Sequence, residues 1–539
     1  MKKTLYKRNI LFSILLSNCF MLFFTSLFGQ SYPFSQKRQS FIKEFSPKLT
    51  KKQMYKDFDE LICILQDCND QLPIRKAVTG IDQLVLAKSF RPKVETISTV
   101  DDFRRLLNTV LNCMYDIHAR ESNIYFVEYD NLKRIDTAIM TYRENNKDFS
   151  FANIFPGNPL FVNGEYFLPG IYQMLDIESK NAVLLYYSKI ISYNGIPYGK
   201  YVQDNLAHFN YAGTRWNDEK KEYYSITSKI PFSGLLTVEN KGEIIDIDLA
   251  KKYQLSLTQS DTIYKKEGIP KLEKPLGEKK VFYFEDDSIL YVYLNDMIDP
   301  DDNTSSKIKE IGTGKPISKI IIDVRGNRGG EDRVWHTILK SIVADTLVYN
   351  PVMAFKNTKW LKKHYSYPNA FTDIKKLDIK VFEWLPDESF LVTNFKPAYL
   401  IPDSNSLQYK GRIYILQNEE VYSAGHSLAT YASHADQLIS VGEPSGLFAG
   451  FGLSPDLFQL KYSKFSFRIE LAIDVSNANK PLDVYQNIPE ITIPIPTKDK
   501  FEYVKDIFYD KQTKAYLYKY DYFIQKSCRY KIKHNYRDL

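Results

Sequence analysis

The segment IIIDVRGNRGG, residues 320–330, decides the fold, because an apolar run of strand length passes directly into a glycine-rich turn. The residues that follow, 331–343, have helical spacing. Further along the chain, GRIYILQ, the stretch 423–434 and QLISVG repeat the order of strand, helix and strand, and SILYVYL supplies a strand upstream. Apolar strands that alternate with helices predict a mixed α/β core with buried parallel strands over residues 276–500.

Two regions of different pattern precede this core. Residues 30–123 carry apolar side chains at helical spacing, such as Phe58, Leu61 and Leu65, and this predicts a helical region. Residues 124–275 change to short alternating or β-branched runs broken by Gly, Pro and Asn, which predicts a β-rich module. Residues 501–539 are rich in Tyr and Lys, and we interpret them as a docked helix or a basic tail.

The N-terminus has the pattern of an export signal. An apolar stretch from Ile10 to Phe28 follows four basic residues, which are Lys2, Lys3, Lys7 and Arg8. This predicts a signal peptide over residues 1–29 and a mature chain that begins near Gln30. An uncleaved membrane anchor is the alternative, because the run is long enough to span a bilayer. We therefore expect an exported protein, either of the periplasm or cell envelope or secreted, that touches the membrane only if the segment stays uncleaved.

Composition narrows the classes of function. Removal of the signal lowers the formal net charge from +7 to +3, too small a charge on a chain of 539 residues to indicate a nucleic-acid partner. Five cysteines are too few for a disulfide scaffold, and a bridge between Cys63 and Cys68 on one helix would strain the backbone. The sequence contains no H-E-x-x-H or C-x-x-C motif, so we expect no metal and no cofactor.

The segment VYSAGHS contains the candidate nucleophile, Ser423. This serine follows a predicted strand and opens a helix with the small residues Ala424 and Gly425. Backbone N–H groups at a helix start stabilise negative charge beside the hydroxyl. The alternative is a plain helix N-cap, for which serine is a preferred residue. Val421 replaces the first glycine of a G-x-S-x-G elbow, so a lipase-like hydrolase is not supported.

The glycine-rich turn that follows the strand 320–324 can direct backbone N–H groups into a cleft. A phosphate loop is excluded, because the turn lacks a Gly-Lys-Ser/Thr ending and the acidic Glu331 and Asp332 begin the next helix. The remaining interpretations are glycines that serve only packing, or an oxyanion hole formed with N–H groups of Gly329 and Gly330. Two such turns meet at the carboxyl ends of parallel strands, which predicts a site for acyl transfer.

Four elements in this order resemble the carboxyl-terminal-processing and tricorn-core serine peptidases, the tail-specific protease family. They are DIHAR (116–120), VRGNRGG (324–330), YSAGHS (422–427) and GEPSG (442–446). The resemblance implies a crotonase/ClpP-like mixed α/β peptidase core, an N-terminal helical domain and a PDZ-like module within 124–275. It also implies a peptide or an unfolded protein as the substrate, and presentation of that peptide at the edge of the PDZ-like module.

The departures from the family pattern indicate a branch. No lysine stands between Gly442 and Lys461, where the Ser-Lys members carry their base, so the tricorn-like branch with a histidine base is the better match. By resemblance, His118 is the general base, and His426, one turn below Ser423, is the alternative. Counting back from Pro489 places the supporting carboxylate at Asp483.

These assignments predict a mechanism. His118 deprotonates Ser423, and N–H groups of Ala424 and of Gly329 or Gly330 bind the oxyanion. The expected function is an exported serine endopeptidase. A catalytically inactive member of the same fold that binds peptides or apolar ligands is the alternative.

Overall fold

The computed structural model describes most of the chain between the N-terminal region and residue 493. The described residues are 46, 48–116, 118–122, 159–162, 164–168, 171–176, 180, 182–209, 213–226, 228–231, 233–251, 253–257, 279–299, 303–349, 352–359, 371–373, 390–394, 398–445, 456–476, 480–493, 514, 521 and 524. The predicted signal segment, 1–29, lies outside them. Within these residues, every helix is too short or too polar to cross a bilayer.

A layer of helices forms the N-terminal part, as the apolar spacing predicted. Side-chain caps fix three of the helix starts: Thr50 forms a capping box with Gln53, and Asp82 and Thr99 accept backbone N–H groups. The buried faces share one core, to which Phe58 and Phe103 contribute. Cys63, Cys68 and Cys113 are free thiols. The helices are α3 (Lys51–Cys68), α4 (Gln71–Thr79), α5 (Gln83–Ser89), α6 (Lys93–Thr96) and α7 (Val100–Asn112).

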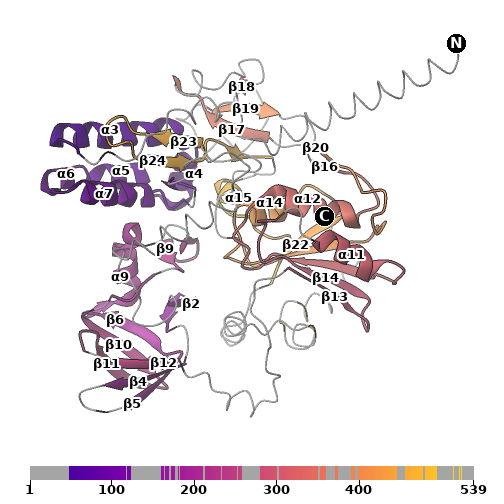
Figure 1. The fold of residues 1–539 in the computed structure, drawn as a ribbon, viewed down its shortest axis with the longest axis horizontal. Coiled ribbons are helices and arrows are strands. Elements are labelled where there is room, and N and C mark those ends of the chain that lie inside the picture. The colour runs from indigo at the N-terminus through magenta and orange to yellow at the C-terminus, as the bar shows by residue number, and fades with distance from the viewer. Residues whose placement is uncertain are drawn as a thin grey trace.

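A small sheet joins this helical layer to residues from the C-terminal half of the chain. Strand β1 (Arg120–Glu121) pairs with β24 (Ser466–Ile469), which pairs with β23 (Asp456–Gln459). Figure 1 shows β23 and β24 against the helices, and the carboxylate of Asp57 in α3 accepts the backbone N–H groups of Tyr462 and Ser463. This contact places the residues that follow β24 beside those that follow α7.

The next part is rich in short antiparallel strands, in agreement with the predicted β module. One sheet has the order β11-β10-β6-β3-β2, with β7 paired to β6; a second has the order β12-β4-β5, and β8 pairs with β9. A PDZ-like identity of this module stays a prediction. Its elements are β2 (Leu160–Val162), β3 (Glu165–Phe167), β4 (Ile171–Asp176), β5 (Ala182–Tyr186), β6 (Lys189–Tyr193), β7 (Ile196–Pro197), α9 (Tyr198–Asp204), η2 (Leu206–His208), β8 (Thr214–Asn217), β9 (Glu222–Ser225), β10 (Leu235–Asn240), β11 (Glu243–Asp248) and β12 (Tyr253–Leu257).

The α/β core is built on a six-stranded sheet of order β13-β14-β15-β21-β22-β26, which confirms the predicted fold class. The hairpin β13-β14 is antiparallel and the remaining pairs are parallel. The carboxyl ends of β15 and β21 therefore lie at the same edge. The core elements are β13 (Lys280–Phe284), β14 (Ile289–Tyr293), α11 (Thr304–Gly312), β15 (Lys319–Asp323), α12 (Asp332–Ile342), β21 (Ile413–Gln417), α14 (Ala424–Ala432), β22 (Leu438–Gly442), α15 (Pro481–Tyr485) and β26 (Ile491–Thr492).

Alternation along the central strands divides their side chains between two cores. Ile320 and Ile322 of β15 pack in the cluster that contains residues of α12 and α14, whereas Ile321 faces a second cluster that includes Tyr291 and Ile524. Both faces of the sheet are thus covered, which explains why its strands are apolar without a polar face. Figure 1 shows α11, α12 and α14 together at this sheet.

Two small sheets complete the core. Strand β16 (Leu347–Tyr349) pairs with β20 (Ala398–Leu400), and a four-stranded sheet has the order β18-β19-β17-β25. Its strands are β17 (Val352–Lys356), β18 (Phe371–Asp373), β19 (Phe390–Asn394) and β25 (Ile473–Asp474).

Candidate active site

Ser423 lies between β21 and α14 in a strained backbone conformation. Its φ of 54° and ψ of −131° are unusual for a residue with a side chain, and such a conformation costs about 1–3 kcal/mol. Although Ser423 occupies the N-cap position, its side chain makes no capping hydrogen bond. The plain N-cap interpretation is therefore not supported, and the half-buried hydroxyl remains available for chemistry.

The glycine turn after β15 touches this serine directly. A Cβ atom built on Gly329 would lie 2.3 Å from Ser423 Cβ, and 2.9 Å from both Ser423 Oγ and the Ala424 nitrogen. Gly329 has a φ of 88°, a second reason why only glycine fits there. The two turns that the sequence places almost a hundred residues apart thus meet at the edge of the sheet.

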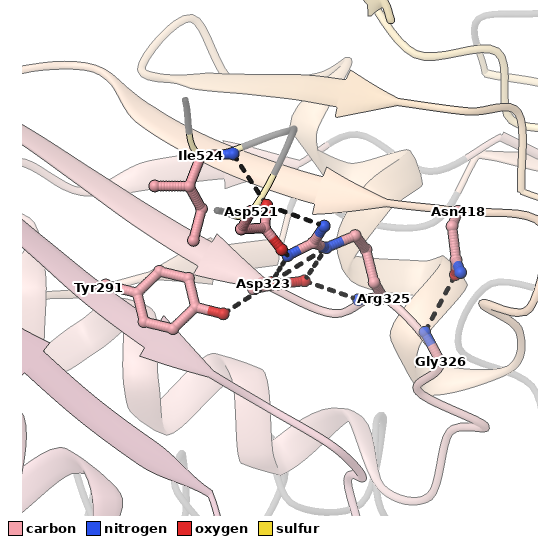
Figure 2. A network of polar contacts seen from close by, with 7 residues as sticks. All are labelled: Tyr291, Asp323, Arg325, Gly326, Asn418, Asp521 and Ile524. Carbon is pink, nitrogen blue, oxygen red and sulfur yellow. Dashed lines mark hydrogen bonds and ion pairs between the residues drawn. The ribbon is translucent and has the colours of Figure 1, made fainter. Parts of the chain in front are cut away.

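Two asparagines fasten the glycine turn to the loop that carries Ser423, Asn327 through its backbone carbonyl and Asn418 through its side chain. Asn327 donates from Nδ2 to the Leu294 carbonyl at 2.8 Å, and its own carbonyl accepts the Tyr422 N–H at 3.1 Å. Asn418 accepts the Gly326 N–H through Oδ1 at 3.0 Å (Figure 2). These bonds hold both turns in one fixed unit, as preorganised oxyanion donors require.

The backbone N–H groups that were predicted to bind the oxyanion differ in the partners that they have in this structure. The Gly329 N–H donates to Asn327 Oδ1 at 2.8 Å. The Ala424 nitrogen begins α14, where the first N–H groups have no partner within the helix. Gly330, with a φ of 143°, packs its Cα against Met297, since a Cβ there would lie 2.1 Å from the Met297 carbonyl oxygen. Ala424 is therefore the donor best prepared to bind an oxyanion.

His118 lies just after α7, where a carboxylate contacts its ring. Its backbone N–H donates to Asp116 Oδ1 at 2.9 Å, and Nδ1 lies 2.8 Å from Glu470 Oε1. Glu470 follows β24, is 2% exposed, and accepts a hydrogen bond from Gln71 Nε2 at 2.7 Å. The pairing of β1 with β24 brings the two segments together.

Charge and burial act on His118 in opposite directions. Burial by itself lowers the pKa of the ring, but the Glu470 carboxylate and its hydrogen bond, with a smaller contribution from Asp116, raise this pKa above its ordinary value of 6.5. A carboxylate at Nδ1 also favours the tautomer that carries its proton there, which leaves Nε2 as the acceptor. Glu470 thus gives the ring the orientation and basicity of a general base.

Asp483, the residue predicted to support His118, has a role in capping a helix. It stands in the first turn of α15, and its Oδ2 accepts the Lys480 backbone N–H at 3.1 Å. Glu470 is the carboxylate that contacts His118 in this structure, and a supporting role of Asp483 stays a prediction. The sequence carried a signal for Glu470, because a glutamate inside the apolar run RIELAI is costly to bury unless it is paired.

His426, the alternative base, is already held by another partner. Its Nδ1 lies 2.8 Å from Ser445 Oγ, within the GEPSG segment. Burial lowers the pKa of His426 to about 4, so its ring is neutral at pH 7. Burial alone sets this shift, whereas carboxylates act on the pKa of His118. A buried ring without a counter-charge is poorly suited to become the imidazolium that proton abstraction creates.

Ser423 and His118, both within the described part of the chain, make no hydrogen bond to each other in this structure. The recorded bonds of Ser423 are through its carbonyl, which accepts from the N–H and the hydroxyl of Ser427. Catalytic hydrogen bonds are often long or absent without substrate and form in the complex. Proton transfer from Ser423 to His118 therefore requires that the two side chains approach.

One group of side chains has the composition of a metal site. Asp116, His118 and Glu470 each offer a ligand atom, and these atoms lie within 4.8 Å of one another. Nitrogen and carboxylate ligands suit a divalent cation such as zinc. The same three residues account for the pKa of the histidine, so the arrangement has a chemical role that needs no metal.

A hydroxyl on a strained strand-to-helix turn, beside a helix N-terminus and a fixed glycine turn, defines the class of this protein as a serine-type hydrolase. Residues 288–477, which contain both turns and Glu470, match the model of peptidase family S41. This match covers about a third of the chain and shows that its α/β core is similar to the carboxyl-terminal processing peptidases of that family, and the protein is a serine-type peptidase.

Several solved structures resemble the chain as a whole. Mature CPAF is 14% identical with a TM-score of 0.49, over 88% of this chain and 99% of that one. The photosystem II D1 C-terminal processing protease is 11% identical with a TM-score of 0.36, over 83% and 95%. The tricorn protease is 12% identical with a TM-score of 0.32, over 86% and 37%. Among curated proteins, the sequence search finds no match.

Proposed function

We propose that this peptidase is an exported endopeptidase that works through a Ser423 acyl-enzyme, with His118 as the general base and Glu470 as its supporting carboxylate. The observation that carries the proposal is the close approach of Gly329 to Ser423 and Ala424: a Cβ built on Gly329 would lie 2.9 Å from both Ser423 Oγ and the Ala424 nitrogen. A carbonyl carbon attacked by Ser423 would place its oxygen beside these backbone donors.

The proposed reaction follows the chemistry of a serine, a histidine and a carboxylate. His118 Nε2 takes the proton of Ser423 Oγ as the oxygen attacks the peptide carbonyl, and Glu470 stabilises the imidazolium that forms. The Ala424 N–H, joined by that of Gly330 or Gly329, binds the oxyanion. The imidazolium then protonates the leaving amine, and water, activated by the same ring, releases the acyl group.

The chain departs from the Ser-Lys type of base. Lys461, the first lysine after Gly442, is exposed, its ammonium stacks over the Tyr462 ring, and its backbone N–H donates to Glu60 of the helical layer. These contacts favour the histidine-based branch. A Lys461→Met variant that keeps its activity agrees with this proposal, and loss of activity in that variant contradicts it.

A fluorophosphonate probe tests the nucleophile and the base together. We expect the wild type to be labelled at Ser423, the Ser423→Ala variant to be unlabelled, and the His118→Ala variant to react at least about 100-fold more slowly, because its serine has no base. The control is His426→Ala, which we expect to keep most of the labelling rate. Equal loss in both histidine variants would reassign the base.

A catalytically inactive scaffold that binds peptides or apolar ligands is the second candidate function. It is favoured by the missing hydrogen bond between Ser423 and His118. Absence of labelling in the wild type, with and without added peptide, together with peptide binding, supports the scaffold and excludes the peptidase mechanism.

Export and peptide presentation complete the proposal. Its support for export is the basic start and apolar stretch of residues 1–29. Mass spectrometry of the mature N-terminus tests it, and a chain that retains residues 1–29 in the cytoplasm contradicts it.

We also infer that the β-rich module presents a peptide strand without needing a free C-terminus. Cleavage of one peptide in amidated and free-acid forms tests this, and a strict requirement for the acid contradicts it.

A further inference from the structure

A buried charge cluster lies at the base of the glycine turn and contains a residue from the C-terminal part of the chain. Figure 2 shows Arg325 between two carboxylates, those of Asp323 and Asp521. Arg325 is 3% exposed, Asp323 is fully buried and Asp521 is 8% exposed. Asp521 lies almost 200 residues after Arg325 and outside the segment that matches the family model. The proposed mechanism gives this cluster no role.

The guanidinium of Arg325 is divided between the two acids. Its Nε donates to Asp323 Oδ1 at 2.9 Å, and Nη2 donates to Asp323 Oδ2 at 2.5 Å. Nη2 also lies 3.0 Å from Asp521 Oδ2, and Nη1 lies 3.3 Å from Asp521 Oδ1. Asp323 therefore accepts from the Nε and Nη2 groups of the guanidinium, and Asp521 accepts from Nη1 and Nη2. A buried charge pair is rigid only when all of its donors find partners.

Asp521 is joined to a second described residue of this part of the chain, Ile524. Asp521 Oδ1 accepts the Ile524 N–H at 2.9 Å, and the Ile524 side chain is fully buried in the apolar cluster on the outer face of the sheet, with Tyr291 and Ile321. Tyr291 donates its hydroxyl to Asp323 Oδ2 at 2.7 Å. Asp521 thus contacts the ionic cluster, and Ile524 packs in the apolar cluster that contains Tyr291; Figure 2 shows both residues.

Arg325 connects this cluster to the active site through its own backbone. Its N–H donates to Asp323 Oδ1 at 3.0 Å, and the next residue, Gly326, donates to Asn418 Oδ1 in the loop that carries Ser423. Three residues further on, Gly329 touches Ser423. The side chain of Arg325 is therefore anchored at the point where the strand becomes the glycine turn.

We propose that Asp521 is a positioning residue for this peptidase: by accepting from Nη1 and Nη2 of the Arg325 guanidinium, Asp521 fixes the glycine turn against Ser423 and Ala424. The inference rests on the proposed function, because it assigns a role to the oxyanion site of that mechanism. The C-terminal part of the chain, which lies outside the family match, then controls the geometry of the catalytic turn.

The test compares Asp521→Asn with wild type in the full-length mature chain. Asparagine keeps the shape and one acceptor but removes the charge. Because a displaced turn loses stabilisation only in the transition state, we expect kcat and the rate of fluorophosphonate labelling to fall about 5- to 50-fold, with KM within about 2-fold. A general loss of structure would instead reduce the fraction of titratable sites and leave the rate per site unchanged.

Lys514→Ala is the matched control. Lys514 comes from the same C-terminal part of the chain, but its ion pair with Glu285, at 2.6 Å, lies on the surface. We expect this variant to keep the wild-type rates within about 2-fold. A second variant, Arg325→Lys, keeps the charge but loses the planar fork that reaches both acids, so its labelling rate should fall as well.

The outcomes are distinct. A wild type that is not labelled refutes the proposed function. A labelled wild type together with a folded Asp521→Asn or Arg325→Lys protein that reacts at the wild-type rate overturns the positioning role. Failure of both variants to fold, with Lys514→Ala normal, also overturns it, because the cluster then serves overall stability instead of the turn.

Discussion

At the scale of single residues, the site depends on how Glu470 is accommodated. A glutamate that is 2% exposed must be compensated, and Gln71 and His118 each contact one of its oxygens. Gln71 is in turn held by Arg75, whose Nη2 donates to Gln71 Oε1 at 2.8 Å. Gln71 and Arg75 therefore fix the position of the Glu470 carboxylate, and the carboxylate fixes the position of the His118 ring. The charge of Glu470 also raises the pKa of His118.

Replacement of Glu470 by glutamine should reveal this role in the pH profile. The carboxylate raises the pKa of His118, and the neutral ring that acts as a base dominates only above that pKa. The rising limb of kcat/KM against pH should therefore move to lower pH in Glu470→Gln, while the plateau falls about 100-fold or more because the imidazolium loses its counter-charge.

Asp483→Asn is the matched control for that prediction, since Asp483 was the carboxylate expected from the sequence. Its side chain caps α15, so we expect kcat/KM within about 3-fold of wild type and an unshifted profile. A profile that shifts in Asp483→Asn and not in Glu470→Gln would restore the earlier assignment.

Gly329 offers a test of the contact between the two turns. Alanine at this position would need a φ of 88° and would put its Cβ 2.3 Å from that of Ser423. We expect Gly329→Ala to lose at least about 100-fold in kcat/KM, because either Ser423 or the turn must move away from its productive position.

Gly314→Ala is the control that separates the effect of backbone strain at a positive φ from the effect of the contact with Ser423. Gly314 has a φ of 75°, but nothing lies within 4 Å of the place of its Cβ. Alanine there should cost about 1 kcal/mol of stability and leave the activity of the folded enzyme unchanged. If both glycine variants keep full activity, the close approach of the glycine turn is not needed for catalysis.

At the scale of elements, the start of α12 carries an unusual acid. Asp332 stands in the first turn, where its Oδ1 accepts the Trp335 Nε1–H at 2.9 Å. Burial raises the pKa of Asp332 to about 6, although the hydrogen bonds from Trp335 and Ser427 act in the opposite direction. Through Ser427, whose hydroxyl donates to the Ser423 carbonyl at 3.3 Å, this acid is linked to the nucleophile turn.

The dependence of the free energy of unfolding on pH should reveal the raised pKa of Asp332. Because its folded-state pKa lies above the ordinary value of 3.8, the folded protein binds more protons than the unfolded chain between pH 4 and 6. Its stability therefore falls as pH rises through that window. Asp332→Asn should remove this fall and gain up to about 3 kcal/mol relative to wild type at pH 7, with little difference at pH 4. Urea unfolding at several pH values measures it, and a difference that is constant with pH contradicts the assignment.

The helices and strands of the core could largely be predicted from the sequence, but the contact between His118 and Glu470 could not. The patterns of residues 331–343 and 423–434 predicted α12 and α14 within about two residues, although only α12 buries a single face and α14 is buried along almost its whole length. The meeting of the glycine turn with Ser423 also followed, since parallel strands align their carboxyl ends. Glu470 was missed because its contact with His118 depends on the pairing of β1 with β24, and no local pattern encodes a pairing of such short strands.

At the scale of the whole molecule, the candidate site draws on three distant parts of the chain. His118 follows the helical layer, Ser423 and Gly329 belong to the α/β core, and Glu470 follows a strand that packs against the helices. Figure 1 shows β23 and β24 of the C-terminal half against this layer. The contact between layer and core therefore determines where the histidine lies relative to the serine, and its strength can be tested separately from the chemistry.

Asp57 is the residue of this contact that we expect to matter most. It is fully buried, and its two oxygens accept the N–H groups of Tyr462, at 2.9 Å, and Ser463, at 2.5 Å, in the turn before β24. Asp57→Ala would leave both donors without their acceptor, at a cost of about 2–5 kcal/mol. Asp59→Ala, on the same helix, breaks an exposed ion pair with Arg91 and should cost less than about 1 kcal/mol. Hydrogen exchange at the Tyr462 and Ser463 amides and the melting temperature are measured for both variants. Equal protection and melting temperature in the two variants would mean that the turn before β24 is held by other contacts.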